Sequence, residues 1–236
     1  MHFVTENPRA PRPQLPLVRT LRRTAIVIAG LVILAVLSAA GWLKLNGVFG
    51  DNVHVVVPGK LYRSALMSRD GLEGLIASAG IASVVSLRAA DESEPGFAAE
   101  IALLQARGIE LQKIPISAVK LPKPVRLGQL IERFDHGPYP MLVHCEEGAD
   151  RSGLASVIWL VAYDGRSLED ARATELTWTK GHFAFGQAHA MDDFFDLYTQ
   201  TARGQALRDW ILTTYPGLYR RQLEPHEGSV AQAAGS

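Results

Sequence analysis

The sequence predicts an α/β fold in which helices cover a mostly parallel sheet. Beyond residue 52, short apolar runs of strand length alternate with longer helical segments, the order that βαβ units produce. Helical segments alone follow the last apolar run, so we expect unequal helical cover on the two faces of the sheet. The chain has 236 residues, which suit one such domain with appendages.

Strands and helices alternate through the first part of this domain. Apolar runs bounded by turn residues mark the strands. A capping residue before and a glycine or proline after mark the helices, as Ser68 and Gly80 do for the first one. In chain order we predict strands at 53–57 and 60–63, a helix at 68–79, a strand at 84–87, a helix at 97–107, a strand at 109–116, a helix at 124–134 and a strand at 141–144.

Only helices are predicted after this last strand. Ser167, with Asp170 three residues later, resembles a capping box, although aspartate replaces the usual Glu or Gln. The predicted helices lie at 152–163, 167–176, 182–198 and 205–214.

The N-terminal part of the chain contains an uncharged stretch at residues 24–43. At about 1.5 Å per residue, its length matches a hydrocarbon core of about 30 Å, so we predict a transmembrane helix. Arginines precede it at positions 9, 12, 19, 22 and 23, and the positive-inside rule then places the N-terminal tail in the cytoplasm. We therefore predict a single-pass membrane protein whose main domain lies on the periplasmic or extracytoplasmic side.

These predictions divide the chain into a disordered cytoplasmic tail (1–23), a transmembrane helix (24–43), a linker (44–52), the main domain (53–222) and a disordered tail (223–236). Two alternatives remain for the uncharged stretch. A signal peptide could be cleaved after Ala40, since Ser38 and Ala40 are small residues at the required spacing. The other is a buried core helix, which the apolar character of every face of the stretch disfavours.

Composition excludes several classes of function. Lys plus Arg and Asp plus Glu both number 24, and no basic stripe with interleaved aromatics is present, so we expect no nucleic-acid partner. The single cysteine, Cys145, allows no internal disulfide, and no Cys/His cluster has the spacing of a zinc site. We therefore expect no metal.

The most informative segment is residues 144–153, which read His-Cys-Glu-Glu-Gly-Ala-Asp-Arg-Ser-Gly. A predicted strand precedes it and a predicted helix follows, so Cys145 begins a tight loop at a helix N-terminus. Backbone N–H groups that converge in such a loop bind anions, and the same positive end stabilises a thiolate. Arg151, six positions later, offers a planar fork of donors to two phosphate oxygens. The segment combines a nucleophile, an anion cradle and a bidentate clamp.

This segment resembles the H-C-x-x-G-x-x-R-S/T-G signature of the cysteine-dependent protein tyrosine and dual-specificity phosphatases, in a bacterial-type, membrane-anchored form. Upstream, residues 58–64 resemble the entry strand of compact dual-specificity phosphatases, and residues 80–88 resemble their helix end, strand and turn. The resemblance covers about residues 53–200. It implies the three-layer cysteine-phosphatase fold and phosphomonoester hydrolysis through a phosphocysteine, with no cofactor.

The resemblance also implies roles for individual residues. Cys145 is the nucleophile, and Arg151 binds the equatorial phosphate oxygens. Ser152 donates a hydrogen bond to the sulfur and helps the thiolate leave, and His144 supports the loop backbone rather than moving protons. The phosphate-binding loop then consists of Glu146, Glu147, Gly148, Ala149, Asp150 and Arg151.

The general acid is missing from the place where the family usually carries it. Dual-specificity phosphatases supply an aspartate from a loop well before the cysteine, and here Ser117 holds the corresponding place. A hydroxyl is too weak an acid to substitute easily. We favour Asp150, because some bacterial and lipid-acting relatives carry aspartate at that position. Asp91 or Glu92, just past a strand end, is the alternative, and the third possibility is that the chain has no acid.

Charge near the loop bears on the substrate. The acids Glu146, Glu147 and Asp150 surround one arginine, and their negative potential favours a phosphotyrosine-like or other single phosphoryl group. The expected partner is a phosphorylated protein or a small phosphomonoester, with a lipid phosphate as an alternative. Cations gathered at the mouth of the site would reverse this negative potential. The candidates are Arg63, Arg88 and Lys120.

Two other functions compete with hydrolysis. A pseudophosphatase would bind phosphate without turnover, which the missing upstream aspartate favours and the intact Cys145 and Arg151 disfavour. A sulfurtransferase also uses a loop cysteine at a strand end, but its loop is usually shorter and lacks the His…Arg-Ser-Gly frame.

Overall fold

The computed structural model describes residues 16–45, 50–183 and 189–221. The chain divides into two compact units, 1–44 and 45–236, and each is described by itself. The predicted tail at 223–236 lies outside the described residues.

A mixed sheet forms the centre of the second unit. In the described residues it has five strands in the order β1-β2-β5-β3-β4. Only β1 is antiparallel to its neighbour, and all other pairs are parallel, which confirms the predicted mostly parallel sheet. The strands are β1 (His54–Val57), β2 (Leu61–Ser64), β3 (Ser83–Ser86), β4 (Glu110–Lys113) and β5 (Met141–His144).

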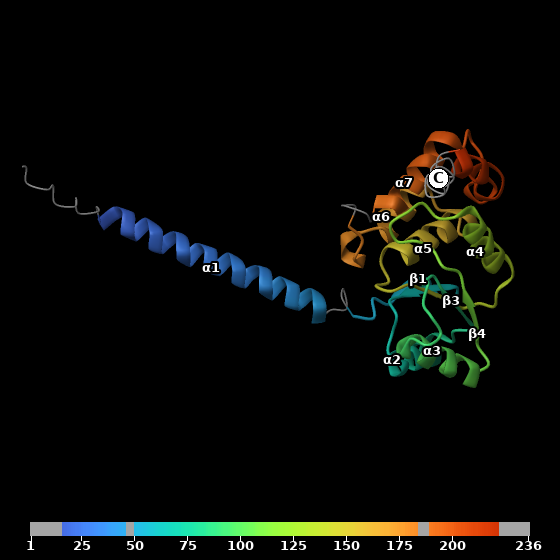
Figure 1. Ribbon diagram of the computed structural model, residues 1–236, viewed down its shortest axis with the longest axis horizontal. Helices are drawn as coiled ribbons and strands as arrows, with labels where there is room; N and C mark the ends of the chain where they lie inside the picture. Colours follow the sequence, from blue (N-terminus) through green and yellow to red (C-terminus); the bar gives the residue numbers. More distant parts are fainter. Residues whose placement is uncertain (1–15, 46–49, 184–188, 222–236) are drawn as a thin grey trace, which may run out of the picture. The chain divides into compact units, whose positions relative to one another are not determined.

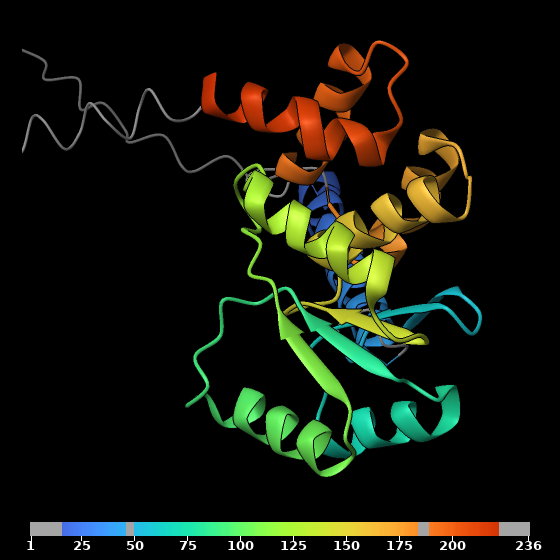
Figure 2. The ribbon, with the colours of Figure 1, turned by 90° about the vertical axis from the view of Figure 1, so that its right-hand side faces the viewer.

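Helices cover both faces of this sheet, as Figure 2 shows. One face carries α2 (Arg69–Ala79) and α3 (Pro95–Ala106). The opposite face carries a larger group, labelled in part in Figure 1: α4 (Pro124–His136), α5 (Asp150–Tyr163), α6 (Leu168–Glu175), α7 (Ala190–Thr201) and α8 (Leu207–Asp209). The unequal cover predicted from the late helices is confirmed.

The central strands bury side chains on both faces. Val84 and Leu142 belong to the apolar cluster under α2 and α3, whereas Val85 and Val143 belong to the larger cluster that includes α4 and α5. Successive strand side chains point to opposite faces, so these two apolar neighbours on each strand supply both cores. The buried strand β5 therefore holds the start of the following loop firmly at the sheet's carboxyl edge.

Three boundaries differ from the sequence prediction and bear on the site. Helix α5 begins at Asp150, two residues before the predicted start, so it includes the second half of the loop motif. The helix predicted from His182 begins only at Ala190. Before it, η1 (Trp178–Lys180) ends at Gly181, whose φ of 83° suits glycine and turns the chain. The helix predicted at 205–214 is α8 followed by a π-helical segment, η3 (Trp210–Thr214).

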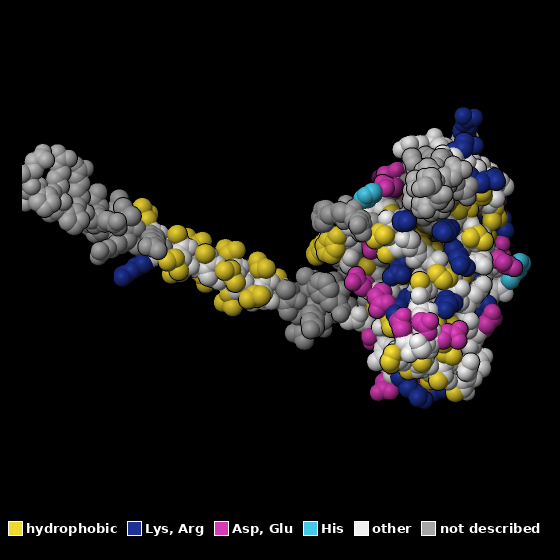
Figure 3. All heavy atoms as spheres, in the orientation of Figure 1, with side chains coloured by type: hydrophobic (Ala, Val, Ile, Leu, Met, Phe, Trp, Pro, Cys, Tyr) yellow, Lys and Arg dark blue, Asp and Glu magenta, His cyan; other side chains and the backbone are white. Residues whose placement is uncertain are grey.

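The first unit is one helix, α1 (Pro16–Leu45). It begins inside the predicted tail 1–23, because proline suits the first turn of a helix and no breaker follows it. Its described apolar side chains are exposed (Figure 3). In the described part of the chain no helix is both long and apolar enough to cross a membrane, so the predicted transmembrane helix at 24–43 is not supported. The side chains of residues 40–43 lie outside the description.

Candidate active site

The loop that follows β5 is joined to the strands on either side. Leu66 N donates to Glu146 O at 3.1 Å beyond the end of β2, and Leu87 N donates to His144 O at 2.9 Å beyond the end of β3. Cys145 therefore stands at the carboxyl edge of the sheet, where open α/β sheets bind their ligands.

Gly148 is required in the middle of the loop. Its φ is +66°, and a Cβ at this position would lie 2.4 Å from Ala65 N and 2.5 Å from the Ser64 carbonyl carbon. Any side chain would push the loop away from the end of β2, so glycine sets how closely the loop packs on the sheet.

Arg63 lies beneath the loop and is fully buried. Its Nη2 donates to Gly148 O at 2.7 Å and to Ala149 O at 2.8 Å. In a trans peptide the C=O and the following N–H point in opposite directions, so the N–H groups of Ala149 and Asp150 face away from Arg63. Arg63 thereby orients loop amides as an anion cradle requires. The prediction that Arg63 could lie at the mouth of the site is therefore wrong, because its guanidinium is buried beneath the loop.

The other half of the Arg63 guanidinium is held by Glu175 at the end of α6. Nη1 donates to Glu175 O at 2.6 Å and to Oε2 at 2.9 Å, while the other carboxylate oxygen pairs with Lys180 Nζ at 2.8 Å. Gly153 in α5 allows this approach, because a Cβ there would lie 2.7 Å from Leu176 and 3.1 Å from Glu175 O. A buried, charged scaffold thus fixes the floor of the loop.

A second support comes from Asn52, which the sequence analysis assigned to a linker. The Asn52 amide donates to Glu147 O at 2.9 Å, Gly148 O at 3.0 Å and Lys180 O at 3.1 Å. His54 Nε2 lies 2.7 Å from Asn52 Oδ1 and fixes the amide's orientation. Burial, with the nearby positive charge of Arg63, lowers the pKa of His54 to about 4, so this ring is neutral at physiological pH.

Cys145 and Ser152 face one another across the loop. Cys145 is buried, and its Sγ lies 3.7 Å from the Ser152 hydroxyl oxygen in the first turn of α5. This places Ser152 within hydrogen-bonding range of the sulfur, the contact that the family resemblance implies.

Arg151 lies at the same edge of the sheet. Its Nη1 donates to Leu87 O at 3.4 Å, and Leu87 N is itself bonded to the carbonyl of His144. The guanidinium therefore lies at the adjoining ends of β3 and β5, close to where Cys145 begins the loop.

His144 turns toward α3 instead. Its Nε2 lies 2.9 Å from buried Glu100, and its Nδ1 lies 3.4 Å from Cys145 O.

Asp150 contacts a histidine that the sequence analysis did not select. Asp150 Oδ1 lies 2.6 Å from His182 Nδ1, and His182 Nε2 lies 2.9 Å from Asp192 Oδ2 in α7. Burial acts to lower the pKa of His182, but hydrogen bonds to these two carboxylates outweigh it and raise the pKa above its ordinary value. No motif joins residues so far apart, and only the fold brings them together.

The other acid candidates are engaged locally. Asp91 is exposed, and its Oδ1 accepts the backbone N–H of Ser93 at 2.9 Å and the Ser93 hydroxyl at 2.7 Å. The first of these hydrogen bonds chiefly lowers the pKa of Asp91, which keeps the carboxylate ionised. Ser117 Oγ accepts the N–H groups of Val119 and Lys120 and so closes its own turn.

Arg88, one of the cations expected at the mouth of the site, does not present a free positive charge. Arg88 pairs with Glu146 at 2.5 Å and with Glu94 at 2.9 Å, so two carboxylates offset its charge. In the described part of the chain, no group of three or more His, Cys, Asp or Glu side chains is placed to hold a metal ion.

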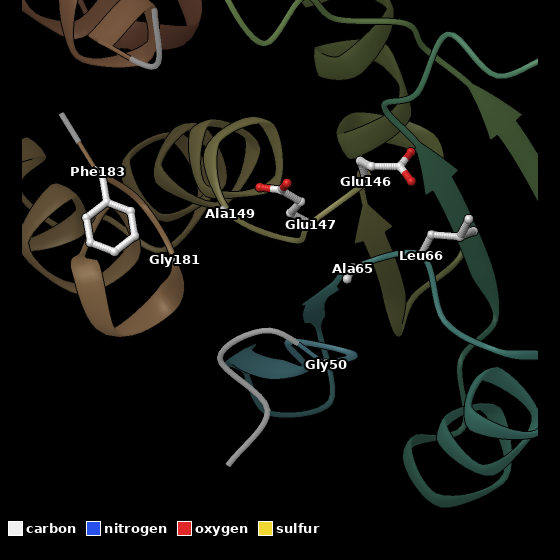
Figure 4. Close-up of a pocket in the computed structure, with 8 residues that line it drawn as sticks. All are labelled: Gly50, Ala65, Leu66, Glu146, Glu147, Ala149, Gly181 and Phe183. Carbon is white, nitrogen blue, oxygen red and sulfur yellow. The ribbon is translucent and has the colours of Figure 1, made fainter. Parts of the chain in front are cut away.

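A cavity of about 390 Å³ opens beside the loop (Figure 4). Ala149 and Glu147 line it from the loop, and Gly181 and Phe183 line it from the segment that carries His182. The remaining lining residues are Gly50, Ala65, Leu66 and Glu146.

The sequence of residues 51–192 matches the family model of the Swiss Army Knife protein DSP-PTPase phosphatase domain. The chain belongs to this phosphatase family. The match covers more than half of the chain and includes the whole loop, the supports from Arg63 and Asn52, and the Asp150–His182 contact. A comparison with curated proteins finds no match.

Solved structures show the same fold. The Siw14 catalytic core from S. cerevisiae aligns with a TM-score of 0.50 and 17% identity, covering 67% of this chain and 94% of that chain. A DUF442 protein from Shewanella putrefaciens CN-32 aligns with a TM-score of 0.50 and 18% identity over 68% and 94% of the two chains. TpbA from P. aeruginosa has 23% identity and a TM-score of 0.46 over 69% and 89%. The first two confirm the phosphatase-type α/β fold.

Proposed function

We propose that this protein is a cysteine-dependent phosphomonoesterase that works through a phosphocysteine at Cys145. The orientation of the loop carries the proposal: Arg63 holds the carbonyls of Gly148 and Ala149 beneath it, which turns the following N–H groups to the opposite side. Cys145 begins this cradle and Arg151 closes it. Nucleophile, amide donors and guanidinium are thus gathered at one sheet edge.

In the proposed first step, the Cys145 thiolate attacks phosphorus in line while the alkoxide or phenoxide leaves. The loop amides and Arg151 stabilise the charge on the equatorial oxygens. Water then attacks the phosphocysteine, and inorganic phosphate and the thiolate are released. Ser152, 3.7 Å from the sulfur, donates a hydrogen bond to the departing thiolate.

Asp150 is the proposed general acid of the first step and general base of the second. It stands in the first turn of α5, directly before Arg151, and its Oδ2 makes no hydrogen bond or ion pair with the described residues. Asp91 is exposed and is held in its own turn by Ser93. Asp150 is therefore the better placed of the two to reach a phosphoryl group bound in the loop.

The proposed substrate carries a single phosphoryl group, on a protein or on a small molecule. Arg88 is offset by Glu146 and Glu94, so the mouth offers little free positive charge to a polyphosphorylated substrate. The cavity beside the loop carries Glu147 and the Phe183 ring, which suit an uncharged or aromatic leaving group better than an anionic one.

The main test uses the full chain and its Cys145→Ser variant. We expect hydrolysis of 4-nitrophenyl phosphate and, with ³²P-labelled substrate, a ³²P label on the protein after rapid denaturing quench. Both should fall at least about 10³-fold in the variant, because a serine hydroxyl stays protonated. Unchanged hydrolysis by the variant would refute the proposal. Phosphotyrosine peptides, phosphoserine peptides and phosphoinositides then rank the substrate classes.

The role of Asp150 is tested by leaving-group dependence. In Asp150→Ala, kcat/KM for phenyl phosphate should fall about 10²-fold, because a poor leaving group needs the proton in the first step. The kcat/KM for 4-nitrophenyl phosphate should change little, because it does not include hydrolysis of the phosphocysteine. Asp91→Ala is the matched control and should affect neither substrate. Equal losses on both esters in Asp150→Ala would remove Asp150 from this role.

A non-catalytic phosphate-binding module is the second candidate. The observation in its favour is that Ser117, at the family's usual acid position, is bound within its own turn. Phosphate binding by the full chain without any hydrolysis or ³²P label would select this candidate.

The extracytoplasmic location stays a sequence-based proposal. It depends on the arginines that precede the uncharged stretch at 24–43. A topology reporter fused after Ser236 tests it, and a cytoplasmic signal would overturn it.

A further inference from the structure

We propose that His182 is a positioning residue that stores the proton which Asp150 delivers to the leaving group. This inference rests on the proposed hydrolysis. It assigns a role to a side chain that lies thirty-two positions beyond Asp150 in the chain and reaches it only through the fold.

Both nitrogens of the His182 ring are engaged by carboxylates. Nδ1 lies 2.6 Å from Asp150 Oδ1, Nε2 lies 2.9 Å from Asp192 Oδ2, and the residue is only 5% exposed. A neutral imidazole has one N–H, so it can satisfy only one carboxylate as a donor, whereas an imidazolium satisfies both. The surroundings therefore select the protonated ring, or a neutral ring that accepts a proton held by Asp150.

Charged groups from each neighbouring element surround the His182 ring. Asp150 comes from α5, and Asp192 comes from α7. Arg172 from α6 pairs with Asp192 at 2.9 Å and with Asp196 at 2.6 Å. Lys180, on the segment of His182 itself, is paired with Glu175 at 2.8 Å. Arg172 holds Asp192 in an ion pair, so we assign the mobile proton to the Asp150–His182 pair.

Two arrangements of this pair carry the same net charge: an Asp150 carboxylate with an imidazolium, and a protonated Asp150 with a neutral ring. An isolated aspartate is almost fully ionised at neutral pH, so it would rarely hold a proton when a leaving group departs. A short hydrogen bond to an imidazolium keeps one available.

The proton balance closes over both steps. As the P–O bond breaks, the one mobile proton of the pair passes through Asp150 to the leaving oxygen, which leaves an Asp150 carboxylate beside a neutral His182 ring. The pair is then one proton short. When water attacks the phosphocysteine, Asp150 accepts one proton from that water and restores the pair.

The position of the pair fits delivery to a bound substrate. The residues that flank it, Ala149 on one side and Gly181 and Phe183 on the other, line the cavity beside the loop. Asp150 Oδ1 faces the histidine, and its Oδ2 has no partner among the described residues, so this second oxygen is available to a leaving group.

The test compares His182→Gln with the wild-type full chain on phenyl phosphate and on 4-nitrophenyl phosphate. Glutamine still forms hydrogen bonds but does not titrate. We expect kcat/KM for phenyl phosphate to fall about 10–100-fold, and kcat/KM for 4-nitrophenyl phosphate to fall less than about threefold, because kcat/KM reports the first step alone. The basic limb of the wild-type phenyl phosphate profile should lie above pH 6.5, the ordinary value for His182. In the variant that limb should move to lower pH.

The matched control is His189→Gln. His189 also contacts a carboxylate, Asp193 at 2.6 Å, but both side chains are exposed, and neither contacts Asp150 in the described residues. It should leave both rates and the pH profile unchanged. Equal losses on both esters in His182→Gln, with the basic limb unmoved, would overturn the inference.

A second measurement covers the case in which His182→Gln does not fold. NMR titration of the His182 ring should give a pKa above 6.5 in the wild type, and this pKa should fall in Asp192→Asn together with the basic limb of phenyl phosphate hydrolysis. A limb that stays in place while the ring titration moves would refute the role. Failure of the proposed function itself looks different, because the wild type would then give neither ³²P label nor hydrolysis.

Discussion

Two histidines support different parts of the loop proposed to bind phosphate, and their surroundings shift their pKa values in opposite directions. His54 contacts Asn52, which holds the carbonyls of Glu147 and Gly148, and burial beside Arg63 lowers its pKa to about 4. His182 contacts Asp150 and Asp192, whose carboxylates raise its pKa. The comparison shows that the loop has a floor that does not respond to pH near neutrality and a proton-linked edge at the start of α5.

The largest expected effect comes from removing the charge of Arg63 beneath the loop. Arg63→Met should lower the free energy of unfolding by about 3–5 kcal/mol, because it leaves Glu175 buried without its full partner set and orphans two loop carbonyls. Urea denaturation measures this change, and hydrolysis should be lost with it. Arg166→Met is the control, since its pair with Asp164 is exposed and should contribute less than about 1 kcal/mol. Equal effects of the two variants would show that the floor is not fixed by Arg63.

Gly148→Ala should have the next largest effect. The new Cβ would lie 2.4 Å from Ala65 N in a left-handed backbone conformation, so we expect a loss of at least about 2 kcal/mol and a displaced loop with reduced kcat/KM. Gly165→Ala is a matched control, because Gly165 has a φ of +72° but no atom within 4 Å of the new Cβ. It should cost about 1 kcal/mol and leave kcat/KM unchanged. A normal kcat/KM in Gly148→Ala would contradict the close packing of the loop on β2.

Asn52→Gly should have a smaller effect of about 1–3 kcal/mol, because it removes the amide that holds two loop carbonyls. Glycine is chosen since Asn52 has a φ of 44°, where alanine would add strain. Arg203→Gly, at an exposed position with a φ of 49°, controls for the backbone and should be neutral or slightly stabilising. Thermal unfolding of both variants gives the comparison, and similar shifts would show that the Asn52 contacts contribute nothing.

Features that depend on neighbouring residues in the chain could be predicted from the sequence, and contacts between distant residues could not. The strands, the Ser68 cap, and the loop between β5 and α5 come from contiguous patterns, and all of them are present in the structure. Arg63 was noticed for its charge but misplaced, because nothing in a strand of four residues shows that its guanidinium faces the underside of a distant loop. Asn52 and His182 lie in segments without periodicity, and the loop residues that they contact are at least thirty positions away in the chain.

The prediction of a transmembrane helix also depended on local sequence alone. An uncharged stretch was interpreted from length and composition alone, and the structure supports a helix there without supporting a membrane span. The uncharged stretch predicted a helix correctly, but its sequence pattern contains no information on what surrounds that helix.

The smallest effect is the pH dependence of stability, and it separates the two histidines by sign. His54 has a folded pKa of about 4, below its unfolded value of about 6.5, so the unfolded state binds more protons between these values. Its contribution to stability is therefore present above pH 6.5 and is lost as the pH falls toward 4. His182 has a folded pKa above its unfolded value, so its contribution is fully present below pH 6.5 and is lost as the pH rises through the folded pKa. Urea denaturation from pH 4 to pH 9 of the wild type, His54→Gln and His182→Gln should thus give difference curves that slope in opposite directions. Parallel curves would mean that the two parts of the loop share one electrostatic environment, and the division between a fixed floor and a proton-linked edge would have to be abandoned.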